Sequence, residues 1–127
     1  NEILESLGHD VDDQGWHGDE SCDYPDIAVA VCQRVTSGAS DRGILVCGTG
    51  IGMSIAANKI DGIRAALANT AAAAELATQH NNANILCLAG NDFDPENYRQ
   101  IVTAWLAATF EGGRHERRIN KVKSLEK

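Results

Sequence analysis

The stretch Gly43-Ile44-Leu45-Val46-Cys47-Gly48-Thr49-Gly50-Ile51-Gly52-Met53-Ser54 decides the expected fold of this chain. Its first five residues are apolar, which predicts a strand covered on both faces of a parallel sheet. The glycines that follow predict a tight turn, and a helix is expected over residues 52–60. Backbone N–H groups in such a turn, together with the N-terminus of the helix, can cradle an oxyanion or a phosphate.

The spacing of these glycines excludes two common nucleotide sites. It is not the dinucleotide pattern G-x-G-x-x-G, and no lysine stands where a P-loop requires one. Neither a nicotinamide nor a nucleoside triphosphate is therefore predicted here. Packing alone also explains a glycine-rich turn, so the turn by itself does not establish a ligand site.

Outward from this stretch, apolar strands alternate with helices. We expect strands at residues 9–13, 43–47, 63–67 and 83–88. We expect helices around residues 4–7, 25–38, 52–60, 70–79 and 95–106, and another after residue 113. This order predicts right-handed crossovers and an α/β fold, a three-layer α-β-α sandwich with a parallel, Rossmann-like sheet. The length of 127 residues fits a single domain, 1–127.

Composition and charge narrow the class of protein. The formal net charge of −7 argues against a nucleic-acid partner, because a phosphate polymer repels an acidic surface. No apolar run approaches the roughly 20 residues that span a bilayer, and residues 1–5 do not begin a secretory signal. We expect a cytoplasmic protein that interacts with no membrane.

The four cysteines form no C-x-x-C pair, which argues against a structural zinc site. Cys32 and Cys87 lie in apolar runs and are predicted to be core residues, and Cys22 shows no clear pattern. Cys47 differs because it ends a predicted strand beside a helix N-terminus, a position that favours the thiolate. Such a thiol can act as a nucleophile or abstract a proton, although a small buried side chain is an alternative at this position.

Basic residues gather near the C-terminus of this otherwise acidic chain. Arg114 and Arg118 stand four residues apart, so on a helix they share one face and can bind a phosphate together. A solvated basic helix is the alternative interpretation. An aldose–ketose isomerase needs one base, donors for an enediolate oxyanion and a cationic phosphate anchor, and the sequence offers each.

Four segments together resemble the type B ribose-5-phosphate isomerases and the related galactose-6-phosphate isomerase subunits. The first runs from Cys47 to Lys59, the second is Asp23-Tyr24-Pro25-Asp26, and the third is His80-Asn81-Asn82-Ala83-Asn84. The fourth is Glu111-Gly112-Gly113-Arg114-His115, with Arg118 one helical turn beyond Arg114. Their order and spacing follow the family over nearly the whole chain, so the resemblance implies a sugar-phosphate aldose–ketose isomerase.

The resemblance also implies roles for single residues. It makes Cys47 the enediolate-forming base, Thr49 part of the oxyanion-stabilising loop, and His80 the histidine that opens the sugar ring. The remaining positions are implied to bind the substrate through its oxyanion, hydroxyl or phosphate groups. These positions are Tyr24, Gly48, Gly50, Gly52, Asn81, Arg114 and Arg118.

The resemblance implies no metal and no cofactor. It implies a homodimer or homotetramer whose active sites are shared between subunits, and a small-molecule sugar phosphate as substrate. A non-catalytic, partner-dependent sugar-phosphate-binding paralogue remains an alternative. A thiol-dependent hydrolase is another, but it lacks a convincing acid partner.

Three segments depart from the family pattern. The strand with a Ser-Asp-His-Ala-Gly type turn that opens family chains has no counterpart in this sequence, and its loss is expected to leave its neighbouring strands unpaired. Trp16-His17-Gly18 fills the loop before Asp23 in an unusual way. At Gly90-Asn91-Asp92, ribose-phosphate enzymes commonly carry an arginine, so a substrate other than ribose 5-phosphate is a hypothesis.

Overall fold

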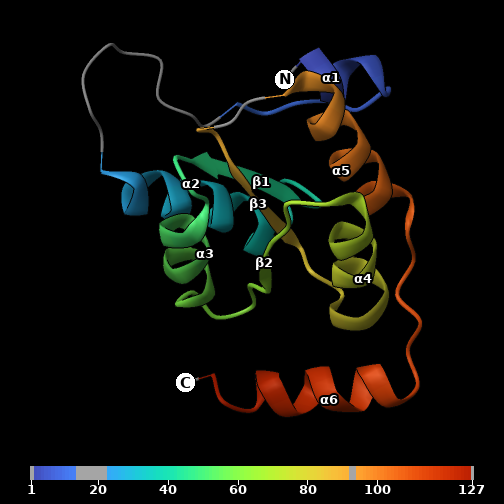
Figure 1. Cartoon of the computed structure of the whole chain (residues 1–127). Helices are drawn as coiled ribbons and strands as arrows, with labels where there is room; N and C mark the ends of the chain where they lie inside the picture. The colour runs from blue at the N-terminus through green and yellow to red at the C-terminus, as the bar shows by residue number, and fades with distance from the viewer. Residues whose placement is uncertain (1, 14–22, 92–93, 127) are drawn as a thin grey trace.

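A computed structural model describes residues 2–13, 23–91 and 94–126 of the chain (Figure 1). The strands are β1 (Gly43–Cys47), β2 (Ala65–Leu67) and β3 (Ile85–Ala89). The helices are α1 (Glu2–Ser6), α2 (Tyr24–Thr36), α3 (Ile51–Asn58), α4 (Ala71–Asn81), α5 (Pro95–Ala107) and α6 (Arg114–Lys123). No helix in these described ranges is long and apolar enough to cross a bilayer.

The three strands form one parallel sheet in the order β1-β3-β2. The central strand β3 is apolar along its whole length, and its residues Ile85 to Leu88 are buried. A strand in this position is covered on both faces, which explains a continuous apolar run rather than an alternating one. Cys47 pairs with Ala89, so both lie at the carboxyl end of the sheet.

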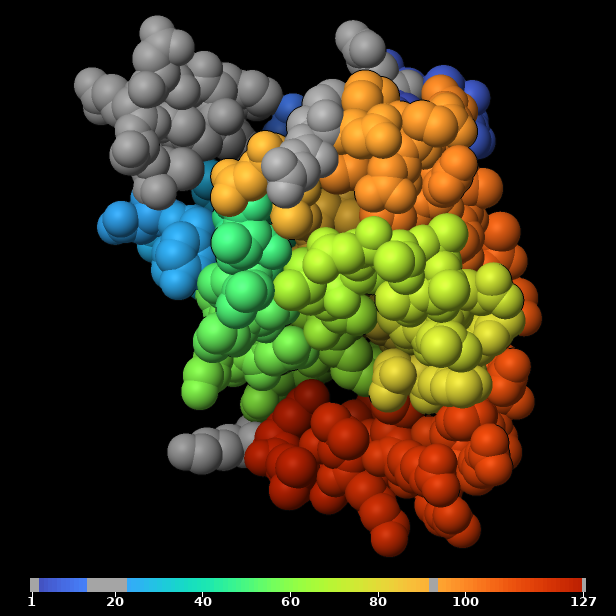
Figure 2. All heavy atoms as spheres, in the orientation of Figure 1, coloured from blue at the N-terminus to red at the C-terminus, as the bar shows by residue number. Residues whose placement is uncertain are grey.

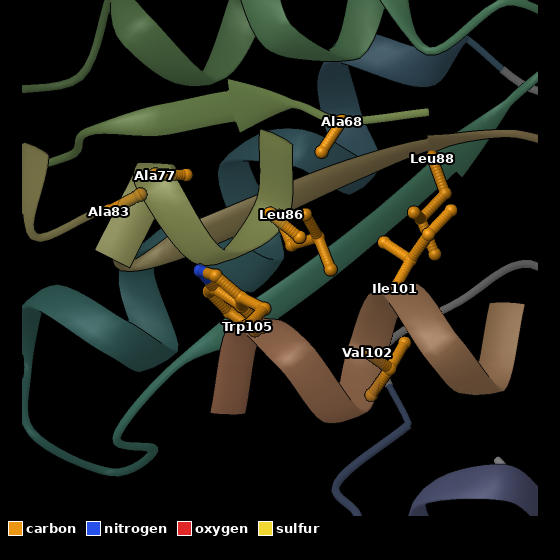
Figure 3. Packing of buried hydrophobic residues seen from close by; sticks show 9 residues of the cluster. Ala68, Ala77, Ala83, Leu86, Leu88, Ile101, Val102 and Trp105 are labelled. Carbon is orange, nitrogen blue, oxygen red and sulfur yellow. The ribbon is translucent and has the colours of Figure 1, made fainter. Parts of the chain in front are cut away.

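Helices cover each face of the sheet, which confirms the predicted three-layer α/β sandwich (Figure 1). Ile85 and Cys87 of β3 pack with α2 and α3, whereas Leu86 and Leu88 pack with α4 and α5. In Figure 3, Ile101 of α5 points toward Leu88. These opposed faces follow from the two-residue period of a strand.

The last helix, α6, lies outside this sandwich at one end of the molecule, at the bottom of Figure 2. It contacts the end of α4, and its inward face carries His115 and Ile119. Residues 114 and 118 therefore lie on a neighbouring face of the helix, which is open to solvent.

One predicted strand was wrong. Residues 9–13 form no strand, because a strand needs a hydrogen-bonding neighbour and β1 is bonded only to β3 within the described part of the chain. The other elements lie within a few residues of their predicted bounds. The predictions for Trp16-His17-Gly18, for Cys22 and for Asp92 fall outside the described residues.

Candidate active site

The Cys47 loop, residues 47–52, links the end of β1 to the start of α3. Gly50 caps α3 with a φ of 79°, and a Cβ added there would come within 2.5 Å of Leu67 Cδ1. Only glycine fits this position, both for its backbone conformation and for the space around it. The turn directs the Gly50 N–H toward the Cys47 sulfur, with a distance of 3.2 Å from N to Sγ.

The side chain of Thr49 bonds within the turn that leads into the same helix. Its Oγ1 accepts a hydrogen bond of 3.2 Å from the Ile51 N–H. A hydroxyl that accepts a bond still has its own hydrogen to donate. The loop therefore presents a thiol, a hydroxyl donor and helix N-terminal amides at the carboxyl edge of the sheet, where open α/β sheets bind ligands.

Tyr24 and Asn91 flank the loop on two sides. A Cβ on Gly52 would lie 2.7 Å from Tyr24 Cζ, and a Cβ on Gly48 would lie 3.1 Å from Asn91 Oδ1. The Asn91 N–H also donates to the Gly48 carbonyl at 3.0 Å. The structure thus places Tyr24 and the amide of Asn91 beside the Cys47 loop.

Three of the described cysteines are free thiols, and they differ in accessibility. Cys32 and Cys87 are fully buried, which confirms the core prediction. Burial raises the pKa of Cys32 to about 11. Burial, with Cys32 and Cys47 nearby, raises the pKa of Cys87 to about 12. Both stay protonated at neutral pH, so Cys47 is the accessible thiol of the described residues.

A second group of chemically active side chains, the histidine cluster, consists of His80, Glu111 and His115. The two imidazole rings stack with their centroids 4.1 Å apart and their planes inclined by 9°. Glu111 Oε1 lies 3.7 Å from His80 Nε2 and 3.5 Å from His115 Nε2. The sequence pointed to His80 but gave no role to Glu111 or His115, because their contacts join α4 to the segment before α6 and to α6 itself.

Burial lowers the pKa of His115, and the neighbouring His80 and Arg114 lower it further. Glu111 opposes this effect and Arg118 adds to it. His115 is therefore held in its neutral form at physiological pH.

Arg114 and Arg118 are exposed on α6 beside the histidine cluster. Among the described residues, 2–13, 23–91 and 94–126, neither guanidinium forms an ion pair with a carboxylate. Both charges are therefore available to an anion. Asn81 is exposed as well and lines a cleft of about 1150 Å³ between α6 and residues 58–66.

The histidine cluster offers three ligand atoms within 4.8 Å of one another, as a metal site requires. The stacked, nearly parallel rings, however, place two of these ligand atoms on one side, whereas a tetrahedral metal site needs its ligands spread around the ion. The two arginines nearby also repel a cation. The arrangement suits proton transfer and anion binding better than metal coordination.

The Cys47 loop and the histidine cluster lie at opposite ends of the sheet. His80 ends α4 just before β3 begins, whereas Cys47 pairs with the last residue of β3. A strand of five residues is roughly 16 Å long. Within one chain, the structure therefore does not bring His80, Asn81, Arg114 or Arg118 to Cys47.

Comparison with known proteins shows the family to which the chain belongs. The family model described as Ribose/Galactose Isomerase matches residues 1–122. The chain belongs to this ribose/galactose isomerase family. It is 43% identical over 123 residues to the ribose-5-phosphate isomerase B of Escherichia coli, a match that covers 97% of this chain and 83% of that protein.

Solved structures of ribose/galactose isomerase family members share the fold. The ribose-5-phosphate isomerase B of Clostridium thermocellum superposes with a TM-score of 0.94 at 46% identity, covering 98% of this chain and 84% of that one. The enzyme of Mycoplasma genitalium, solved with bound ribulose-5-phosphate, gives a TM-score of 0.90 at 43% identity, with 97% and 82% covered.

Relatives within the family differ in the sugar phosphate that they are named for. The D-erythrulose-4-phosphate isomerase of Pectobacterium atrosepticum is 43% identical over 99 residues, which is 78% of this chain and 65% of that protein. Family membership therefore leaves the length of the sugar open.

Proposed function

We propose that this chain is an aldose–ketose isomerase for sugar phosphates, with Cys47 as the group that moves the proton. The observation that carries the proposal is the Gly50 N–H directed at the Cys47 sulfur at the N-terminus of α3, with a distance of 3.2 Å from N to Sγ. A donor aimed at sulfur binds a thiolate more strongly than a thiol, and the helix N-terminus acts in the same sense.

The reaction follows from the groups in the Cys47 loop. The thiolate removes a proton from the carbon beside the carbonyl, which generates an enediolate, and returns a proton to the adjacent carbon. The loop amides and the Thr49 hydroxyl stabilise the oxyanion that develops on the former carbonyl oxygen. No net electron transfer to another molecule occurs, so the chemistry needs no nicotinamide.

The phosphate and the sugar ring need the groups at the other end of the sheet. We propose that two copies of the chain form a homodimer in which His80, Asn81, Arg114 and Arg118 of one subunit face the Cys47 loop of its partner. A two-fold axis builds two such sites at once. Support comes from the apolar side chains exposed on α3 next to the loop, since Ile51 is 52% and Ile55 is 59% exposed.

The substrate is proposed to be a pentose or tetrose phosphate of the kind named for the relatives above. Asn91 touches the Cys47 loop and carries no charge, so it cannot bind phosphate as the arginine commonly found there can. This difference supports a substrate whose phosphate is held by Arg114 and Arg118 alone.

The relatives described above are all named as isomerases, and nothing among them favours a non-catalytic binding protein.

The free thiols of Cys32, Cys47 and Cys87 fit a reducing compartment, so we propose the cytoplasm as the place of action.

The proposal is tested by following proton exchange in deuterated water. The protein is incubated with ribulose 5-phosphate and with erythrose 4-phosphate, and NMR records deuterium at the carbon next to the carbonyl. Exchange by the parent and none by a folded Cys47→Ala variant supports the proposal. Undiminished exchange by Cys47→Ala removes Cys47 from the mechanism. A parent protein that neither exchanges the proton of a sugar phosphate nor isomerises it refutes the proposed activity.

A further inference from the structure

Glu111 is held in place by its backbone before its side chain acts. Its N–H donates a 3.0 Å hydrogen bond to the carbonyl of Gln79, the residue before His80. This bond fixes the segment ahead of α6 against the last turn of α4. The carboxylate then reaches the Nε2 atoms of His80 and His115 together, at 3.7 and 3.5 Å.

A carboxylate beside one ring nitrogen selects the tautomer of a neutral histidine. It attracts the ring N–H, so the proton resides on Nε2 and the lone pair remains on Nδ1. The His115 ring packs flat against the His80 ring, with centroids 4.1 Å apart, and covers one face of it. His115 is itself only 9% exposed, so the surrounding residues hold its ring in place against His80.

We infer that Glu111 is a positioning residue that holds His80 with its proton on Nε2, so that Nδ1 exchanges a proton with the cyclic sugar, and that His115 supports this orientation. The inference rests on the proposed isomerase function and assigns a role to two residues outside the proposed substrate contacts. Neither Glu111 nor His115 needs to touch the sugar.

The ring-opening step balances with these groups. The anomeric hydroxyl gives its proton to Nδ1, and its electron pair forms the carbonyl as the bond from C1 to the ring oxygen breaks. The ring oxygen takes the same proton back from the imidazolium. During this exchange Glu111 stabilises the charged ring of His80, while Arg114 and Arg118 of α6 bind the phosphate and His115 stays neutral.

The arrangement also explains why two stacked histidines are tolerated here. Two imidazolium rings 4.1 Å apart repel each other, so the pair takes up one proton more easily than two. The lowered pKa of His115 disfavours a second positive charge in the histidine cluster. One carboxylate is enough to balance one positive charge.

The test compares a sugar that closes into a ring with one that cannot. Ribose 5-phosphate forms a furanose, whereas erythrose 4-phosphate has its O4 esterified and stays open. Glu111→Gln keeps the shape of the side chain and removes its charge. Glu116→Gln, an exposed carboxylate on α6, is the matched control.

We expect Glu111→Gln to lower kcat/KM for ribose 5-phosphate by about tenfold or more, a part of the 10²–10⁴ that general acid–base catalysis contributes. For erythrose 4-phosphate, and for deuterium exchange into ribulose 5-phosphate, which is also open, the change should stay within about twofold, roughly 0.4 kcal/mol. Glu116→Gln should leave all three rates unchanged. Equal losses for open and cyclic sugars, or no loss for either, overturn the inference.

A second readout does not depend on activity. The ¹⁵N chemical shifts of His80 should show the proton on Nε2 in the parent and a mixture of tautomers in Glu111→Gln. A parent His80 with its proton on Nδ1 contradicts the inference, even where the enzyme is active. Failure of the proposed function looks different, because it requires that the parent isomerises neither sugar.

Discussion

Replacing Gly50 by alanine should destabilise the fold more than the same change at another left-handed glycine. At φ 79° a residue with a Cβ lowers the free energy of unfolding by roughly 1–2 kcal/mol relative to glycine. The Cβ also comes within 2.5 Å of Leu67 Cδ1 and 3.1 Å of the Leu88 backbone. Overpacking of this kind costs about 1–3 kcal/mol, so the total is roughly 2–5 kcal/mol.

Gly38 provides the matched control. Its φ is 83°, and a Cβ there meets nothing within 4 Å. Gly38→Ala therefore loses only the backbone part, about 1–2 kcal/mol, and both variants change the unfolded chain in the same way. The free energy of unfolding is measured by urea denaturation. Equal losses in the two variants would refute the packing argument for the Cys47 loop.

Three further predictions concern the residues around the site. Arg114→Ala or Arg118→Ala should raise KM for a sugar phosphate by about tenfold or more, because a charge-assisted hydrogen bond contributes about 1.5–3 kcal/mol; equal losses for the unphosphorylated sugar would indicate a structural role instead. The pKa of His115 is lowered in the fold, so the unfolded chain binds its proton first, and the stability it contributes is complete above about pH 6.5 and is lost as the pH falls. Urea melts at several pH values should show a shallower decline in His115→Gln than in the parent, and parallel curves would exclude this linkage. Asn91→Arg should raise the activity on ribose 5-phosphate relative to that on other sugar phosphates in a substrate panel. A parent protein that already prefers ribose 5-phosphate by a wide margin would disprove the proposed shift in substrate preference.

The local elements of the fold could be predicted because their causes are local. The apolar run at 43–47 and the glycines after it specify a buried strand and a tight turn, and both formed as expected. The helices begin near residues such as Pro25 and Pro95, which fit the first helical turn. Residues 9–13 could not be predicted this way, because a strand depends on a neighbour that its own pattern does not contain.

The candidate site could be predicted in part for a related reason. The glycine-rich pattern located Cys47 and Thr49 on one loop, and the family resemblance implied Tyr24 at the same site; the structure places Tyr24 beside this loop. The contact of Glu111 with His80 could not be read from spacing, since it depends on a bond from the Glu111 N–H to the Gln79 carbonyl across the fold. Nor does the sequence say that His80 lies a strand's length from Cys47.

Mixing two inactive variants tests whether each active site is shared between two subunits. Cys47→Ala and His80→Ala are purified separately, mixed in equal amounts, allowed to exchange subunits, and assayed with ribose 5-phosphate. If each site joins Cys47 of one subunit to His80 of the other, half of the dimers are mixed and each has one intact site. The activity should then return to about one quarter of the parent level. No recovery in a mixture shown by mass spectrometry to contain mixed dimers would contradict the account, because it would place both residues of each site in the same chain.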